Sequence, residues 1–249
     1  MSGEQEFSEG GSRIERHETP DDGLVAPAEP LPGAHESIEG YFQQHFGEVS
    51  EVYHELVSHR VHLDVHIICA TKDRPFHVLF TTGMSDLPMT VPEGVPAPTR
   101  AELMIALPAS WPLDQKCWKD ENNYWPIGVL KMLARMPHEY GTFLGAGHTI
   151  PNGDPPQPFA PNTSLCCSFL LELLGLVPDQ GRVELDGGES IQFYNVMFLH
   201  HGEVQLKLEK GTDALLERFG NQVAPVLDVG RPDVTRSKPV GRKKRFGLF

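Results

Sequence analysis

Residues 61–89 read VHLDVHIICATKDRPFHVLFTTGMSDLPM, a pattern typical of two buried strands joined by a short turn. In the first run His62, Asp64 and His66 alternate with apolar residues. A period of two places these three polar side chains on one face of a strand. The polar turn leads to a second strand, predicted over 76–82 because this run is rich in β-branched and aromatic residues.

A corner of sequence GMSD, residues 83–86, follows the second strand. Gly83 permits a backbone φ above zero, and the Asp86 carboxylate can accept hydrogen bonds from nearby backbone N–H groups. We therefore expect a tight change of direction here, with the rest of the chain packed around the strand pair.

Hydrophobic periodicity predicts the remaining elements. Apolar residues at spacings of three and four over 34–58 indicate a helix that Gly47 divides or kinks. Pro126 suits the first turn of a second helix, and 202–219 predicts helix with a break near Gly211. Further strands are predicted over 101–107, 143–150, 164–174, 190–198 and 223–229, with an aromatic-rich connection over 111–125. The pattern predicts an α+β fold: a single mixed α/β domain with a central, mostly antiparallel sheet flanked by helices.

Composition divides the chain into three parts. Residues 1–34 have few large apolar side chains and predict a disordered acidic N-terminal tail. Residues 35–229 are expected to form the folded domain, and 230–249 a flexible basic C-terminal tail. The basic tail carries +6 of the formal net charge of −13, which leaves −19 on the rest. It fits a solvated segment, or a tether to an acidic surface, RNA or anionic lipid.

The acidic charge limits the partners of the folded part. A net charge of −13 would repel phosphates, so we expect no nucleic-acid binding by the folded domain and favour a basic protein partner. No apolar run approaches the roughly 20 residues that cross a bilayer, and no signal peptide is evident, so no membrane association is expected. The cysteines lack CxxC spacing and are expected to be reduced core thiols in a cytoplasmic protein: Cys69, Cys117, Cys166 and Cys167.

The sequence lacks the common catalytic motifs. It contains no GxSxG, Walker, HExxH or GxGxxG pattern, so we predict neither an enzyme nor a cofactor. The sharpest alternative is a metal-dependent enzyme that holds Zn²⁺ or non-haem iron with His62, Asp64 and His66, about 6–7 Å apart along one strand face. His77 or His148 could complete that set. A hydrogen-bonded amphipathic face explains the same triplet without a metal.

Several of these residues resemble the suppressor of fused-like domain family. The resemblance rests on His62-x-Asp64-x-His66, Arg74-Pro75, Leu79-x-Thr81-x-Gly83-Met84-Ser85-Asp86-x-Pro88-Met89, Glu102-Leu103, Leu107-Pro108, Trp111, Tyr124-Trp125-Pro126 and Gly147-His148-Thr149-Ile150. It spans residues 37–229 and implies a central sheet with flanking helices and a non-enzymatic protein-binding role. Bacterial members look like immunity proteins of toxin systems. The animal member holds a transcription factor by taking its peptide as an added strand between two lobes, and this chain resembles a single lobe.

The predicted binding surface lies around the corner after the second strand. A sheet with an available edge can pair with an extended peptide. Met side chains offer adaptable apolar contacts, and Asp86 offers a charge to a basic partner. A purely structural corner is the alternative. The predicted partner-binding residues are Asp64, Gly83, Met84, Ser85, Asp86 and Met89.

These observations predict a bacterial immunity or antitoxin-type protein that binds a toxin, such as a basic nuclease domain, and blocks it by occlusion. Two alternatives stay open. One is the metal-dependent enzyme, and the other is a chaperone-like adaptor of a secretion system.

Overall fold

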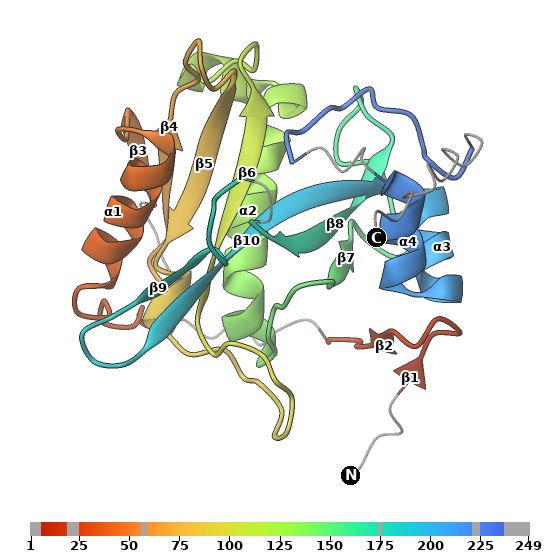
Figure 1. Ribbon diagram of the computed structural model, residues 1–249, viewed down its shortest axis with the longest axis horizontal. Helices are drawn as coiled ribbons and strands as arrows, with labels where there is room; N and C mark the ends of the chain where they lie inside the picture. The colour runs from red at the N-terminus through yellow and green to blue at the C-terminus, as the bar shows by residue number, and fades with distance from the viewer. Residues whose placement is uncertain (1–5, 19–24, 56–58, 174–175, 221–224, 237–249) are drawn as a thin grey trace, which may run out of the picture.

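The computed structural model describes residues 6–18, 25–55, 59–173, 176–220 and 225–236. Its centre is an eight-stranded sheet with the order β3-β4-β5-β6-β10-β8-β7, in which β9 also pairs with β10. Figure 1 shows helices on both faces of this sheet. The structure confirms the predicted α+β domain, because every strand pair of the sheet is antiparallel except β6 with β10.

The first half of the sheet is an antiparallel meander. Its strands are β3 (Glu51–His54), β4 (Asp64–Ile68), β5 (Phe76–Thr82) and β6 (Ala101–Pro108). The strand pair predicted over 61–89 is β4 with β5, in which Asp64 lies opposite Thr82. The turn between them is closed by the Thr71 N–H, which donates to the Arg74 carbonyl at 2.9 Å.

The second half of the sheet joins the first through β10. Its strands are β7 (Thr149–Pro151), β8 (Leu165–Glu172), β9 (Arg182–Glu184) and β10 (Ser190–His200). β10 runs parallel to β6, with Gln192 opposite Ala101, and antiparallel to β8 and β9. The strands predicted over 164–174 and 190–198 are therefore confirmed as β8 and β10.

Helices cover the two faces and one end of the sheet. They are α1 (Ala34–Phe46), α2 (Glu121–Tyr140), α3 (His201–Lys210) and α4 (Thr212–Phe219), with short 3₁₀ turns η1 (Met84–Asp86) and η2 (Gln115–Lys119). In Figure 1 α1 lies beside β3–β5, α2 lies behind the sheet, and α3 and α4 lie beyond β8. The break predicted near Gly211 separates α3 from α4.

Burial on both faces explains why all of β4 is buried. Alternate residues of β4–β6 pack with α2 in one apolar cluster, and the intervening residues pack with α1 in another. In the α1 cluster Phe42 stacks on Phe80 with ring centroids 4.0 Å apart. Aromatic rings that bury this much area contribute strongly to a core, so α1 is fixed against the outer strands.

The structure corrects three predicted elements. The helix predicted over 34–58 ends at Phe46, and its second part is the edge strand β3, where alternation along EVYH outweighs the helical spacing. The helix assigned to Pro126 starts one turn earlier, at Glu121, because the Asp120 side chain accepts from the Asn122 N–H. Of the strand predicted over 143–150, only the end is strand, as β7.

Described parts of both predicted tails touch the domain. β1 (Glu6–Phe7) and β2 (Arg13–Ile14) form a small hairpin, from which the Gly10 N–H donates to the Leu208 carbonyl of α3 at 2.7 Å. At the other end Arg231, in the predicted C-terminal tail, pairs with Glu203 of α3. Val226, near the end of the predicted domain, forms a bridge to Ala106 of β6. The strand predicted over 223–229 falls partly outside the described residues. The division at 34 and 230 stays a prediction.

All four cysteines are free, but only two lie in the core. Cys166 and Cys167 are buried in β8, whereas Cys117 is half-buried and Cys69 is exposed, so the expectation of four core thiols is wrong for these two. Burial raises the pKa of the Cys166 thiol, which disfavours the reactive thiolate. Within the described part of the chain, no helix is long and apolar enough to cross a membrane.

Candidate functional site

The candidate site lies at the outer edge of the sheet, where β3 pairs with β4. Asp64 is opposite His54 on one side and opposite Thr82 on the other. Because β5 ends at Thr82 and continues directly into Gly83, the polar edge and the GMSD corner are adjacent. The fold thus brings Asp64 next to the GMSD corner, although Asp64 and residue 84 are 20 positions apart in sequence.

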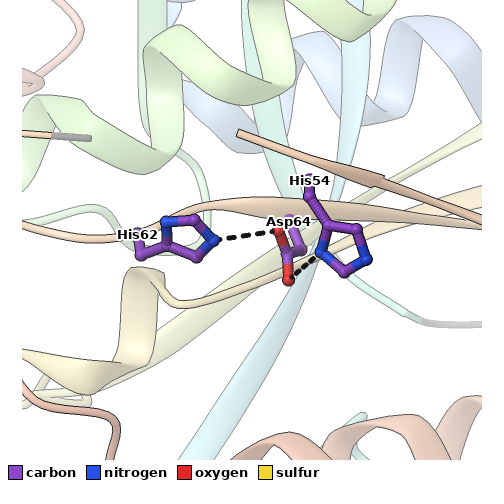
Figure 2. Close-up of side chains that lie close together, drawn as sticks. All are labelled: His54, His62 and Asp64. Atoms are coloured by element: carbon purple, nitrogen blue, oxygen red, sulfur yellow. Dashed lines mark ion pairs between the residues drawn. The ribbon is translucent and has the colours of Figure 1, made fainter. Parts of the chain in front are cut away.

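Three side chains form a compact cluster at this edge. Figure 2 shows the imidazoles of His54 and His62 approaching the Asp64 carboxylate from opposite sides. His54 Nδ1 lies 3.0 Å from Asp64 Oδ2, and His62 Nε2 lies 3.4 Å from Asp64 Oδ1. The Asp64 side chain is 12% exposed, whereas those of His54 and His62 are 67% and 43% exposed. The anion is therefore sheltered while both bases face solvent.

His66 does not belong to this cluster. Its Nε2 lies 3.0 Å from Thr82 Oγ1, and its ring stacks on Phe80 with centroids 4.7 Å apart. Burial lowers the pKa of His66 to about 4, so the ring is neutral at physiological pH. The predicted ligand set of His62, Asp64 and His66 is therefore not assembled, because His66 points into the α1 side of the core.

Gly83 fixes the corner against the strand that carries Asp64. Its φ is 101°, which L side chains rarely adopt, and an added Cβ would collide with the His62 carbonyl oxygen. The backbones of Gly83 and His62 therefore approach closely only because Gly83 has no side chain. This contact sets the position of His62 relative to the corner.

A buried carboxylate lies beneath the corner. Glu102 of β6 has no exposed surface and accepts hydrogen bonds from Ser85 Oγ at 2.6 Å, the Ser85 N–H at 2.9 Å and Thr81 Oγ1 at 2.6 Å. Burial raises the pKa of Glu102 to about 7, although these hydrogen bonds favour its ionised form. The corner is thus held from below by a carboxyl group that has hydroxyl and N–H partners and, among the described residues, no ion pair.

Asp86 connects the corner to the segment that enters α1. Its Oδ1 accepts from the Leu31 N–H at 2.8 Å, and its Oδ2 lies 3.3 Å from His35 Nε2. This hydrogen bond raises the pKa of His35. Asp86 therefore orients the start of the helix that packs behind His66.

The predicted partner-binding residues are collected in one region but are buried. Asp64, Asp86 and Met89 are 8%, 7% and 4% exposed, and Met84 and Ser85 are not exposed at all. In this structure the polar side chains of Ser85 and Asp86 are hydrogen-bonded to other parts of the chain. A partner that approaches this structure would meet His54 and His62 first, so a contact role for the predicted set stays a prediction.

The family model of suppressor of fused protein (SUFU) matches residues 59–232, which include β4–β6 and the corner. The chain belongs to the SUFU family. A SUFU homolog from Neisseria gonorrhoeae has a similar fold, with a TM-score of 0.59 and 13% identity over 81% of this chain and 96% of that chain. A chain in the crystal structure of the Sufu–Fu complex aligns with a TM-score of 0.55 and 15% identity, covering 83% and 93% of the two chains. No curated protein matches significantly.

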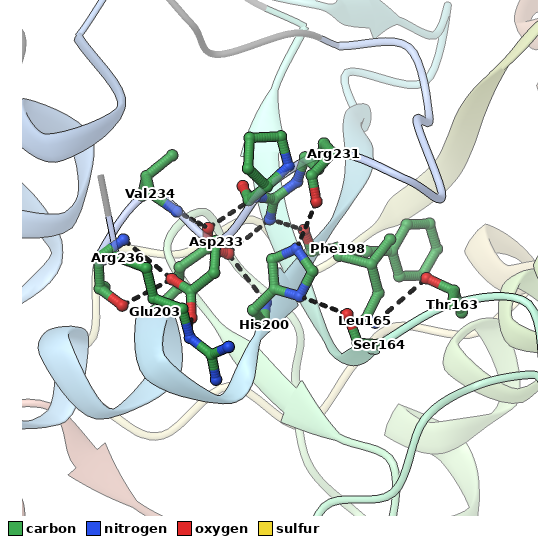
Figure 3. Close-up of polar contacts among 12 residues, drawn as sticks. Thr163, Ser164, Leu165, Phe198, His200, Glu203, Arg231, Asp233, Val234 and Arg236 are labelled. Carbon is green, nitrogen blue, oxygen red and sulfur yellow. Dashed lines mark hydrogen bonds and ion pairs between the residues drawn. The ribbon is translucent and has the colours of Figure 1, made fainter. Parts of the chain in front are cut away.

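The SUFU match ends at residue 232, inside a second polar network that is shown in Figure 3. Glu203 of α3 is fully buried. The two terminal guanidinium nitrogens of Arg231 donate hydrogen bonds to its two carboxylate oxygens, at 2.6 and 2.5 Å. Glu203 also accepts from the backbone N–H of His200 at 2.8 Å and of Val234 at 3.0 Å. We call this the Glu203 latch, because it fastens residues 231–234 to the start of α3.

Sequence reasoning assigned no site role to one residue in each of these networks, although Glu102 was among the residues that carry the SUFU resemblance. His54 was assigned to a helix, although EVYH shows the alternation of an edge strand. Glu102 stands alone within the apolar run AELMIAL, which signals a buried carboxylate in need of partners. Arg231 was assigned to the basic tail because its neighbours in sequence are basic. The partner of each residue lies on another element, and the sequence alone does not show that pairing.

Proposed function

We propose that this SUFU chain is a non-enzymatic protein-binding module of the immunity or antitoxin type, which blocks a toxin by occlusion in the bacterial cytoplasm. The solved Sufu–Fu complex, which shares the fold, supports a protein partner. Free cysteines agree with a reducing compartment. A net charge of −13 favours a basic partner, such as a toxin domain, over nucleic acid or an anionic membrane surface.

The outer edge of β3 carries this proposal. β3 ends the sheet, and no strand of the described chain pairs with its outer side. Glu51 and His54 are exposed, and Val52 is half-buried. An extended peptide can bind such an edge through main-chain hydrogen bonds, with side-chain contacts adding specificity. Asp64 and the corner of residues 83–86 would then support the surface from within.

A charge on β3 tests whether this edge binds the partner. We expect full-length protein to co-purify a partner from its native host, and Val52→Lys to lose that partner because a lysine both blunts an edge strand and repels a basic surface. Met132→Lys is the matched control, since Met132 is exposed on α2. Equal capture by both variants would contradict binding at β3.

The immunity role needs a separate experiment. The captured partner is expected to arrest growth when expressed alone and to be harmless when expressed with this chain. A partner that stays active in the complex would instead support the chaperone-like adaptor. A captured partner that is harmless by itself would reject the antitoxin role.

A metal-dependent enzyme is the second candidate, because two residues of the predicted ligand set do meet, His62 and Asp64. An enzyme would need a substrate cleft beside them. A hollow of about 540 Å³ is present, but its walls come from the N-terminal hairpin and the end of α2, and no residue of the cluster lines it. Turnover of a small substrate that requires Asp64, without any protein partner, would favour this candidate.

A further inference from the structure

We propose that His54, His62 and Asp64 form a binding site for a divalent transition-metal ion of the Zn²⁺ class. The inference goes beyond the proposed function and stands without it. His54 is the last residue of the edge strand β3, and Asp64 is the first residue of β4. His62 lies two positions before Asp64. One ligand atom from each of the three lies within 4.8 Å of the others.

The ligand atoms lie close to the spacing that a tetrahedral ion requires. Zn²⁺ binds imidazole nitrogen and carboxylate oxygen at about 2.0–2.2 Å, which places neighbouring ligand atoms about 3.3–3.5 Å apart. The two His–Asp64 separations are 3.0 and 3.4 Å, and they reach different oxygens, Oδ2 for His54 and Oδ1 for His62, so a shared ion requires the carboxylate or an imidazole to turn. Binding therefore needs small side-chain movements and no change in strand pairing, because His54 and Asp64 are already opposite each other in the β3–β4 ladder.

The state of Asp64 independently favours a ligand. Its Oδ1 is buried and accepts no well-formed hydrogen bond from the described residues, with His62 Nε2 at 3.4 Å as its ion-pair contact, and the residue is only 8% exposed. A buried carboxylate oxygen without a donor is costly, whereas coordination to a cation satisfies it. The same carboxylate is flanked by two imidazoles, which are ligands that Zn²⁺ accepts.

The exposure of the cluster leaves room for a further ligand. The side chains of His54 and His62 are 67% and 43% exposed, so the ion would face solvent on the side away from Asp64. Sites with three protein ligands usually keep one position for water or another group. The ion would also tie β3 to β4, and would stiffen the strand at the end of the sheet.

Titration of untagged, EDTA-treated full-length protein with ZnCl₂ tests the site. We expect one Zn²⁺ per chain by calorimetry, and affinity lower by about tenfold or more in Asp64→Asn and in His54→Gln. His201→Gln is the matched control, because His201 is an exposed histidine on α3. Ca²⁺ should not bind, since it prefers sites made of oxygen ligands.

A second readout distinguishes binding by His54, His62 and Asp64 from binding by the predicted set of His62, Asp64 and His66. It also shows whether a variant has simply lost its fold. Zn²⁺ should slow amide exchange in β3 of the wild type and of His66→Gln, but not of Asp64→Asn, with circular dichroism confirming that each variant is folded. Unchanged Zn²⁺ binding in Asp64→Asn, or no binding by the wild type in excess Zn²⁺, would overturn the proposal.

Discussion

Asp64 and Glu203 are both carboxylates sheltered near a strand end, yet their surroundings differ. Glu203 is sealed by the Arg231 guanidinium and by two backbone N–H groups, and no part of it is exposed. Asp64 has two imidazoles that face solvent, and one of its oxygens accepts no hydrogen bond within the described chain. A carboxylate whose partners are complete holds the fold together, whereas an incompletely satisfied one is poised to take a further ligand.

The largest effect is expected at the Glu203 latch. Arg231→Met leaves Glu203 buried without its cation, which should lower the free energy of unfolding by about 3–5 kcal/mol. Urea unfolding measures it. Arg236→Met is the matched control, because the Arg236 side chain is 87% exposed and pairs with Asp233 at 3.5 Å. If both variants lose the same amount, the latch is not a stabilising network.

Glu102 provides an intermediate case, since it is as deeply buried as Glu203 but its partners are hydroxyl and N–H groups. Its pKa is raised from 4.5 to about 7, so the folded protein holds the proton more tightly than the unfolded chain. The contribution of Glu102 to stability should therefore be greatest below the unfolded pKa and fall as pH rises from about 4.5 to about 7, by on the order of 3 kcal/mol.

Glu102→Gln should remove this pH dependence. Unfolding in urea at about pH 5 and about pH 8 measures the difference between variant and wild type, which should change in favour of the variant at the higher pH. Glu184→Gln makes the same exchange on exposed β9 and should follow the wild type. A parallel response of Glu102→Gln and wild type would show that Glu102 does not titrate in this range.

The smallest effect on stability is expected at the cluster of His54, His62 and Asp64. In EDTA, His54→Gln should change the free energy of unfolding by no more than about 1 kcal/mol, because exposed ion pairs contribute little to stability. The His54 side chain is 67% exposed. A loss as large as that of Arg231→Met would mean that the cluster holds the edge strand without any metal, and would remove the contrast with the Glu203 latch.

The sequence predicted what depends on local pattern. Alternation in the first run predicted β4, the β-branched and aromatic residues over 76–82 predicted β5, and Gly211 correctly separated two helices. It also grouped Asp64 with the corner, and the structure places them side by side, while their role in binding a partner stays a prediction. The SUFU resemblance at these residues agrees with the family match.

Pairing between distant elements explains what the sequence did not predict. His54 joins Asp64 only because β3 is the edge strand, and the segment had also fitted a helical stripe. Arg231 and Glu203 are separated by 28 positions, and the basic composition around Arg231 concealed its burial. Period-two alternation placed His62 and His66 on one strand face. It could not show that the strand begins only at Asp64, after His62, or that His66 faces the α1 side of the core.

The parallel β6–β10 contact has a consequence for how the chain assembles. Gln192 pairs with Ala101, so this seam joins residues that are far apart in sequence, while the pairs β4–β5 and β5–β6 in the first half of the sheet are connected by shorter segments. Closing a long loop costs chain entropy before its contacts form, which slows folding. The two halves of the sheet should thus gain structure separately, and their joining at this seam should govern the folding rate.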